Sequence, residues 1–225
     1  MDNRHDILQL LRQVAGGAAT PEEALLQLKR EPFQDLGYAK VDLHRGVRQG
    51  AAEVIYGAGK TAEQIAGIAA AMGERDCQNV LITRLSQEAA ELVGRTIPLD
   101  YHPIPKLAIA WPGARRSLGH IVVATGGTSD MPVAEEAALT AEVMGNRVTR
   151  LYDVGVAGLH RLLANLEPLM EARCVVAVAG MEGALASVVG GLVDCPVIAV
   201  PTSVGYGANF GGLSALLAML NSCAS

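Results

Sequence analysis

Short apolar runs alternate with longer amphipathic stretches along the second half of the chain. The apolar runs are rich in Val, Ile and Ala and predict buried strands at residues 119–125, 147–154, 173–180 and 195–201. The amphipathic stretches predict helices at residues 131–145, 157–172, 184–193 and 209–222. Because near-continuous apolar strands that alternate with helices are typical of an α/β fold, we expect a doubly wound parallel sheet.

The first half of the chain shows a weaker form of the same alternation. Thr20, Pro21 and Glu23 have the spacing of a helix start with a capping box. Residues 39–45 and 52–58 alternate between apolar and polar positions and predict short strands. A helix beginning after Thr61, a strand at residues 80–86 and a further helix complete a small α/β pattern.

Proline content suggests where one domain ends and the next begins. Residues 96–117 hold four of the ten prolines, which favours a linker. We therefore expect a small N-terminal α/β domain at residues 1–95, the linker at 96–117, and a larger domain at 118–225 that carries the doubly wound sheet.

Composition excludes several classes of partner. Half of the residues are hydrophobic, only 4% are aromatic and the net charge is −5, which indicates a core of Ala, Val, Leu and Ile. There is no Lys/Arg-rich block, so no nucleic-acid partner is expected. No apolar run reaches the ~18–20 residues of a membrane span, and the N-terminus lacks a signal-peptide core. We expect a cytoplasmic protein with no membrane partner.

The cysteines do not have the spacing of a metal or disulfide framework. Cys77, Cys174, Cys195 and Cys223 form no CxxC pair. Cys174 and Cys195 lie in predicted strands and are interpreted as buried thiols. Cys223 differs because it follows an apolar helix, within NSCAS. No cluster of His, Asp and Glu has transition-metal spacing, so no metal-binding residue is expected.

Four loops rich in Gly, Ser or Thr follow the predicted strands. They are GGTSD (126–130), DVGVAG (153–158), GMEG (180–183) and PTSVGYGA (201–208). Because loops at the carboxyl ends of parallel strands meet at one edge, we expect them to form one rim whose backbone N–H groups favour an anion. GxGxxG and GxxxxGK[ST] are both absent, so the rim predicts a nucleotide or acidic metabolite without the standard phosphate loops.

Two carboxylates on this rim have more than one interpretation. Glu182 is the only charged residue within AVAGMEGALASVVGG. Its carboxylate either interacts with the dipole of a helix N-terminus, which would stabilise the protein by under ~1 kcal/mol, or acts on a bound substrate. Asp130 ends GGTSD and is either a helix N-cap or a functional carboxylate.

GGTSD after one strand, with AVAGMEGAL two strands later, resembles the purine-biosynthesis carboxylase and mutase that act on aminoimidazole ribonucleotide. The resemblance implies a Rossmann-like domain of that carboxylase type. The histidine that those enzymes carry after the later turn falls on Ala184, and DVGVAG lacks their second histidine. These absences argue against the purine reaction itself.

Longer stretches are similar to the LarB family, which begins synthesis of the nickel-pincer nucleotide cofactor of lactate racemase. The similarity runs from about residue 40 to the last residue, through KVDLHRGVRQGAAEVIYGAGKTAEQ, ATGGTSDMPVAEEAALTAEVMG, LYDVGVAGLHRLL, AGMEGALASVVGGLVDCPVIAVPTSVGYGA and LSALLAMLNSCAS. Ala186 stands where the family is expected to have Pro, and the sequence stops two residues after Cys223.

The LarB resemblance implies a reaction. The enzyme would carboxylate C5 of the pyridinium ring of nicotinic acid adenine dinucleotide and cleave its phosphoanhydride, giving pyridinium-3,5-biscarboxylic acid mononucleotide and AMP. The ring and CO2 are both electrophiles, so a thiolate must first add to the ring, a role that the resemblance gives to Cys223. Glu182 would activate water, help to hold Mg²⁺ or remove the C5 proton, and Asp130 is an equal candidate for the proton.

The remaining expectations concern ligands and assembly. The substrate would be CO2 or bicarbonate with the dinucleotide, without a tightly bound cofactor, in a homo-oligomer such as a dimer or an octamer. Residues expected to bind the substrate are Gly126, Gly127, Thr128, Ser129, Asp153, Gly180, Met181, Gly183, Thr202, Ser203, Gly205, Tyr206, Arg45 and Arg48. A carboxylase or mutase acting on an aminoimidazole-type ribonucleotide and a non-catalytic nucleotide-binding module are the alternatives.

Overall fold

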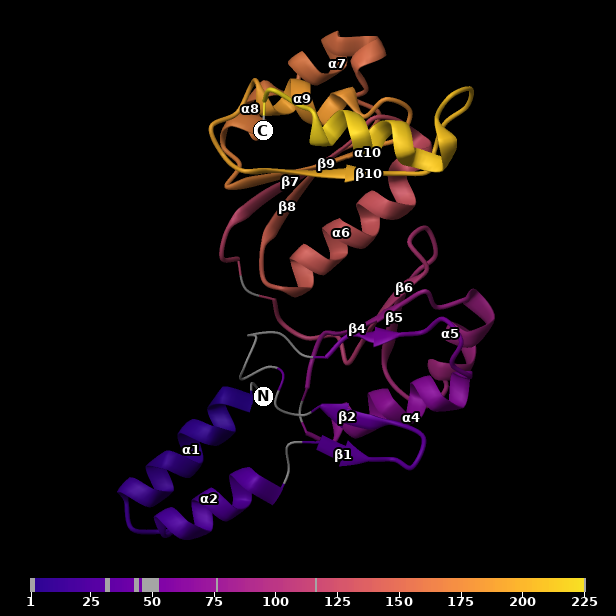
Figure 1. Ribbon diagram of the computed structural model, residues 1–225. Coiled ribbons are helices and arrows are strands. Elements are labelled where there is room, and N and C mark those ends of the chain that lie inside the picture. The colour runs from indigo at the N-terminus through magenta and orange to yellow at the C-terminus, as the bar shows by residue number, and fades with distance from the viewer. Residues whose placement is uncertain are drawn as a thin grey trace. The chain divides into compact units, whose positions relative to one another are not determined.

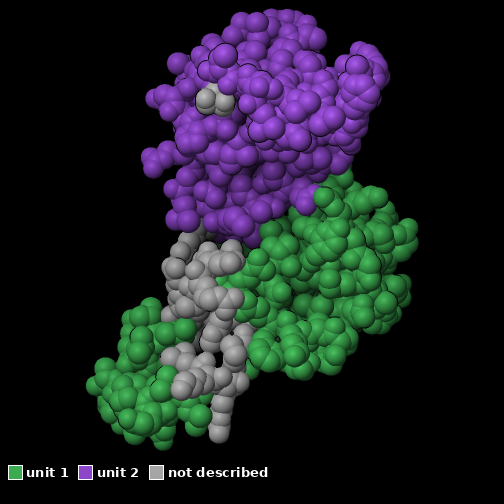
Figure 2. Space-filling model, viewed as in Figure 1, with its two compact units in different colours: residues 1–114 green, residues 115–225 purple. Residues whose placement is uncertain are grey.

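The computed structural model describes residues 3–30, 33–42, 45, 53–75, 77–115 and 117–224. The chain forms two compact units, residues 1–114 and 115–225 (Figure 2). No helix in the described part of the chain is long and apolar enough to span a membrane.

Unit 2 is built on a four-stranded parallel sheet (Figure 1). Its strands are β7 (His120–Thr125), β8 (Arg147–Leu151), β9 (Cys174–Ala179) and β10 (Val197–Pro201). The strand order is β10-β9-β7-β8, so the chain moves outward in one direction after β7 and in the other after β9. This arrangement confirms the predicted doubly wound α/β fold and places a topological switch point between β7 and β9.

Helices cover both faces of this sheet (Figure 1). They are α6 (Met131–Val143), α7 (Leu159–Leu163), α8 (Leu166–Met170), α9 (Ala184–Gly190) and α10 (Leu213–Leu220), with short 3-10 turns η1 (Thr128–Asp130), η2 (Val156–Gly158) and η3 (Phe210–Gly212). Ala134 and Ala138 of α6 pack on one face against Val123 and Val178. Leucines of α7, α8 and α9 fill the other face, where Met219 of α10 joins them.

The single helix predicted at residues 157–172 is interrupted. Asn165, with φ −118°, separates α7 from α8, and its Nδ2 donates to the carbonyl oxygen of Arg161 at 2.8 Å. Pro168 has no N–H to donate to the carbonyl of Ala164, and its ring would clash with that carbonyl in a continuous helix, so the helix breaks before it.

Unit 1 contains two small sheets. Its helices are α1 (Asn3–Ala15), α2 (Pro21–Arg30), α4 (Ala62–Gly73) and α5 (Gln87–Val93), and its strands are β1 (Phe33–Asp35), β2 (Lys40–Asp42), β3 (Ile55–Tyr56), β4 (Val80–Thr83), β5 (Leu99–His102) and β6 (Leu107–Ala110). β1 and β2 pair antiparallel, and the other four strands have the order β3-β4-β6-β5. Only β3 and β4 are parallel in that sheet.

Capping side chains start the helices of unit 1 where the sequence predicts them. Thr20 Oγ1 accepts from the backbone N of Glu23 at 3.1 Å, and Glu23 accepts from the N of Thr20 at 2.8 Å. Thr61 and Gln64 form the same reciprocal pair at the start of α4. Each pair satisfies two backbone donors that have no partner inside the helix.

The segment at residues 96–117 differs from the predicted linker. It contributes β5 and β6 to the sheet of unit 1, and every residue of β6 is buried. The prolines flank the strands without interrupting them: Pro98 precedes β5, Pro103 and Pro105 lie in the turn, and Pro112 follows β6. Proline is compatible with a sheet in such positions, so unit 1 extends to residue 114.

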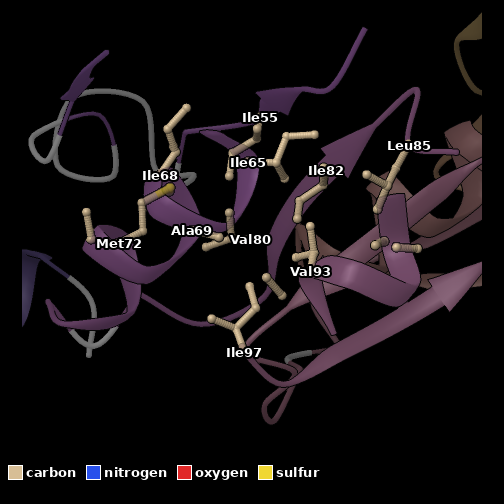
Figure 3. Packing of buried hydrophobic residues seen from close by; sticks show 14 of the residues in the cluster. Ile55, Ile65, Ile68, Ala69, Met72, Val80, Ile82, Leu85, Val93 and Ile97 are labelled. Carbon is tan, nitrogen blue, oxygen red and sulfur yellow. The ribbon is translucent and has the colours of Figure 1, made fainter. Parts of the chain in front are cut away.

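The core of unit 1 lies between α4, α5 and the sheet (Figure 3). Ile65 and Met72 of α4 are fully buried with Ile82 of the central strand β4. Val93 of α5 packs into the same cluster. Because β4 lies between β3 and β6, Ile82 is enclosed by neighbours from both strands as well as from the helices.

We predict that Ile82→Ala destabilises the protein. Ile82 is 0% exposed, and deletion of its buried methyl groups should lower the free energy of unfolding by about 2–5 kcal/mol. Chemical denaturation followed by circular dichroism measures the effect. Leu92→Ala is the matched control, because Leu92 is 46% exposed and should change stability by less than about 0.5 kcal/mol. Equal losses in both variants would contradict this packing.

Candidate active site

Hydrogen bonds hold the loops at the carboxyl edge of the parallel sheet against neighbouring strand ends and against one another. They are Gly126 N to Val178 O (2.9 Å), Val154 N to Thr125 O (3.0 Å), Thr202 N to Ala179 O (3.1 Å) and Met181 N to Val204 O (2.8 Å). The bonds bring together the four loops that the sequence predicted to share a rim. The loops after β7 and β9 flank the switch point, where ligands bind in open α/β sheets.

Asp130 connects two of these loops from a buried position. The residue is 3% exposed. Its Oδ1 accepts from Thr202 Oγ1 at 2.7 Å, and its Oδ2 accepts from the backbone N of Gly127 at 3.0 Å. Although Asp130 occupies the N-cap position of α6, its side chain makes no capping bond to that helix. Its two oxygens instead hold the 126–130 loop against the end of β10.

Glu182 has the opposite environment. The residue is exposed, and its side chain makes no hydrogen bond or ion pair with any described residue. Its neighbours Met181 and Gly183 have φ values of 53° and 69°, so the chain turns sharply on both sides of it. The left-handed conformation is strained for Met181, and such strain is concentrated at functional positions. The turn presents Glu182 at the rim as a carboxylate free to meet a ligand.

Two glycines allow these loops to touch. A Cβ on Gly180 would lie 2.0 Å from Val204 O, and one on Gly155 would lie 2.3 Å from Gly126 O. Neither position can hold a side chain without moving a neighbouring backbone. These glycines therefore have a packing role in addition to the predicted substrate contact at Gly180.

Other predicted binding residues offer open surface. Thr128, Ser129 and Ser203 are exposed hydroxyls on the rim, and Tyr206 is 82% exposed. Gly205 differs from the open glycines of the 126–130 loop, because a Cβ there would lie 2.2 Å from Asn209 Nδ2.

Arg161 is a rim cation that the sequence reasoning missed. Asp153, with φ 56°, donates from its backbone N to Thr125 Oγ1 at 3.0 Å, and its carboxylate pairs with the Arg161 guanidinium. Arg161 lies over the 153–158 loop, since a Cβ on Gly158 would be 2.6 Å from its Nε. The sequence could have indicated Arg161, because this arginine lies on the helix that directly follows the 153–158 loop. The predicted binding residue Asp153 is thus engaged by a cation.

The residues on both sides of Cys223 contact the second half of α9. A Cβ on Gly190, at the end of α9, would be 2.7 Å from Ala224 O, and Ser187 Oγ donates to Ser222 Oγ at 2.8 Å. Glu182 precedes the start of the same helix, which is about 10 Å long at 1.5 Å per residue. Figure 1 accordingly shows the C-terminus at the opposite end of α10 from the loop that follows β10. Cys223 therefore lies nearer the end of α9, whereas Glu182 lies just before its start.

The other cysteines are less accessible. Cys77, Cys174 and Cys195 are half-buried, whereas Cys223 is exposed, and none of the four is in a disulfide. Burial, and to a smaller extent the neighbouring Cys195, raises the pKa of the Cys174 thiol. A thiol with a raised pKa is a poorer source of thiolate, which argues against Cys174 as a nucleophile.

Two further predictions concern the substrate-binding arginines and metal binding. Arg45 is half-buried in unit 1, and Arg48 lies outside the described residues. Across the described ranges, no group of three or more His, Cys, Asp or Glu side chains could hold a metal ion.

Comparison with family models indicates an enzyme of the carboxylase or mutase type that acts on a nucleotide. Residues 120–225 match the family model of AIR carboxylase, and residues 33–112 match that of the LarB/PurE-like N-terminal domain. The chain belongs to the LarB family. It is 36% identical to an uncharacterized protein of Methanocaldococcus jannaschii over 233 residues, which cover 97% of this chain and 88% of that protein.

We predict that Gly127→Leu weakens nucleotide binding without unfolding the protein. Gly127 has extended backbone (φ −145°), and a Cβ there would meet only Asp130 Oδ2, at 3.9 Å. The leucine side chain should obstruct the loop that faces the phosphates. Binding of a nucleotide, measured by calorimetry, should weaken about tenfold or more, which is about 1.4 kcal/mol.

Gly191→Leu is the control for this prediction. Gly191 is exposed at the end of α9 with φ −79°, and its Cβ would make ordinary contacts at 3.6 Å or more. The control should bind normally. Normal binding by Gly127→Leu as well would place the phosphates elsewhere.

Proposed function

We propose that this protein carboxylates C5 of the pyridinium ring of nicotinic acid adenine dinucleotide and cleaves the phosphoanhydride. The products are pyridinium-3,5-biscarboxylic acid mononucleotide and AMP, and the reaction would begin synthesis of the nickel-pincer nucleotide cofactor of lactate racemase. The observation that carries the proposal is Glu182, an exposed and unpaired carboxylate at the switch-point rim of a LarB-family chain. CO2 or bicarbonate is the second substrate.

The chemistry requires a reversible nucleophile. A thiolate adds to the pyridinium ring and converts it into an electron-rich dihydropyridine, whose C5 attacks the carbon of CO2. A base then removes the C5 proton, and departure of the thiolate restores the aromatic ring. Cys223 is proposed as this nucleophile because it is the exposed cysteine and its thiol is accessible to a ring.

Glu182 is a better candidate than Asp130 for the proton transfers. Both oxygens of Asp130 already accept hydrogen bonds, and the residue is buried. Glu182 is free to activate water for phosphoanhydride cleavage or to remove the C5 proton. If Mg²⁺ takes part, Glu182 would hold it together with the substrate phosphates, an arrangement that Mg²⁺ accepts because it needs few protein ligands.

The positions of Glu182 before the start of α9 and of Cys223 near its end support a site shared between copies of the chain. The C-terminal helix α10 has four leucines that are largely exposed, Leu213, Leu216, Leu217 and Leu220. Such an apolar face is typical of a protein–protein contact. In a homo-oligomer, Cys223 of one copy would approach the rim of another, which would complete the site.

Two alternatives are less well supported. An aminoimidazole-type carboxylase or mutase would need an imidazole at the rim, but Ala184 begins α9 where that family has its histidine. A non-catalytic nucleotide-binding module would have no use for a free carboxylate or an exposed thiol.

The first test is turnover by wild-type protein and by Glu182→Gln. Wild type should convert the dinucleotide and bicarbonate into AMP and the dicarboxylated mononucleotide, detected by mass spectrometry. Glu182→Gln keeps the shape of the side chain but loses the base, so AMP release should fall about 10²–10⁴-fold while the thiol adduct still forms. Glu171→Gln, a change of an exposed glutamate just before β9, is the control. If Glu182→Gln releases AMP normally but no longer carboxylates the ring, Glu182 is the base that removes the C5 proton. If both AMP release and carboxylation are normal, the charge of Glu182 has only a structural role.

The second test mixes two inactive variants. Cys223→Ala should abolish carboxylation, whereas Cys77→Ala should leave it almost unchanged. If each site takes its thiol and its carboxylate from different copies, exchange of subunits between Cys223→Ala and Glu182→Gln should restore roughly a quarter of the sites. No recovery after verified exchange would refute the shared site, and near-normal carboxylation by Cys223→Ala would remove the covalent step.

A further inference from the structure

Asn209 is buried beneath the rim and contacts three segments of it. The residue is 5% exposed and precedes η3. Its Nδ2 donates to Met181 O at 3.3 Å and to Val204 O at 3.2 Å, and its Oδ1 accepts from the backbone N of Gly212 at 2.6 Å. Both donor positions and the acceptor of the side-chain amide are therefore used.

These bonds act on the peptide group that carries Glu182. The Met181 carbonyl belongs to the peptide bond between Met181 and Glu182, so the Asn209 amide holds the backbone from which the carboxylate projects. Val204 O also accepts from Met181 N at 2.8 Å, so the same oxygen fixes Met181 from its other side. Met181 has φ 53°, and its strained turn needs such external support.

Only an amide meets this set of partners. Two carbonyl oxygens accept from this side chain, while Gly212 N donates to it, and the asparagine amide supplies both kinds of group. A carboxylate of the same shape would place an oxygen against two carbonyl oxygens. A longer side chain has no room, because Gly205 already lies against the amide.

We propose that Asn209 is a positioning residue that acts through Glu182. The inference rests on the proposed function, in which Glu182 is the base. By fixing the Met181–Glu182 peptide group, Asn209 sets the direction of the carboxylate toward the substrate, and it touches no substrate atom itself.

The kinetic test is a double-mutant cycle. Asn209→Asp should lower kcat for AMP release roughly 10- to 100-fold, since a small misplacement of a catalytic group has an effect of this size. KM for the dinucleotide should change little, because the phosphate loop at residues 126–130 is untouched. In the Glu182→Gln background the same change should have almost no further effect. Equal losses in both backgrounds would overturn the proposal.

Asn146→Asp is the matched control. Asn146 also donates from its side-chain amide to a backbone carbonyl, Ala141 O at 3.1 Å, but it lies after the end of α6, away from the rim. It should leave kcat unchanged. If Asn209→Asp fails to fold by circular dichroism, Asn209→Ala removes the same bonds without adding a charge, and the same cycle applies.

Hydrogen exchange separates this proposal from the proposed function. Asn209→Asp should speed amide exchange in peptides covering residues 180–183 and 203–212, while β9 keeps its protection. If Asn209→Asp leaves amide exchange in these peptides unchanged, Asn209 does not brace the turn, whatever the enzymatic activity of the variant. If wild type does not turn over the dinucleotide, the proposed function fails, whereas faster exchange would still support bracing of the Glu182 turn.

Discussion

The hydrogen bond between Thr202 and the buried carboxylate of Asp130 is the constraint on which the candidate site depends. It joins residues 72 positions apart in the chain and fixes the end of β10 against the loop that follows β7. A net contribution of about 1.5–3 kcal/mol is usual for a hydrogen bond to a charged group, and the loss of one partner leaves a buried charge unsatisfied. The 126–130 loop is held against the end of β10 because this carboxylate has two donors.

The two carboxylates divide two tasks between them. Asp130 is enclosed and engaged, so it shapes the loop, while Glu182 is exposed and unengaged, so it remains available to a substrate. Asn209 is proposed to support the turn that carries Glu182, because its buried side-chain amide makes three hydrogen bonds, one of them to the strained Met181. A rigid frame beneath an exposed functional group is what preorganised catalysis requires.

Local chemistry explains which features were predictable. The capping pair of Thr20 and Glu23 and the strands of the parallel sheet follow from residues close together in the chain. The linker prediction differed from the structure because proline counts do not show whether prolines interrupt strands or flank them. The break at Asn165 was missed because apolar periodicity was followed through Pro168, a residue that cannot continue a helix.

The sequence by itself determined the doubly wound fold, the order of its elements and the set of loops at one sheet edge, since each follows from hydrophobic periodicity and turn chemistry. It also singled out Asp130, Glu182 and Cys223 but left their roles open. Tertiary structure decided that Asp130 is buried with both oxygens bonded, that Glu182 is free, and that Cys223 lies at the far end of α9 from it. The physical reason is that burial, hydrogen-bond partners and distance arise from contacts between distant parts of the chain, and the identity of a residue does not specify them.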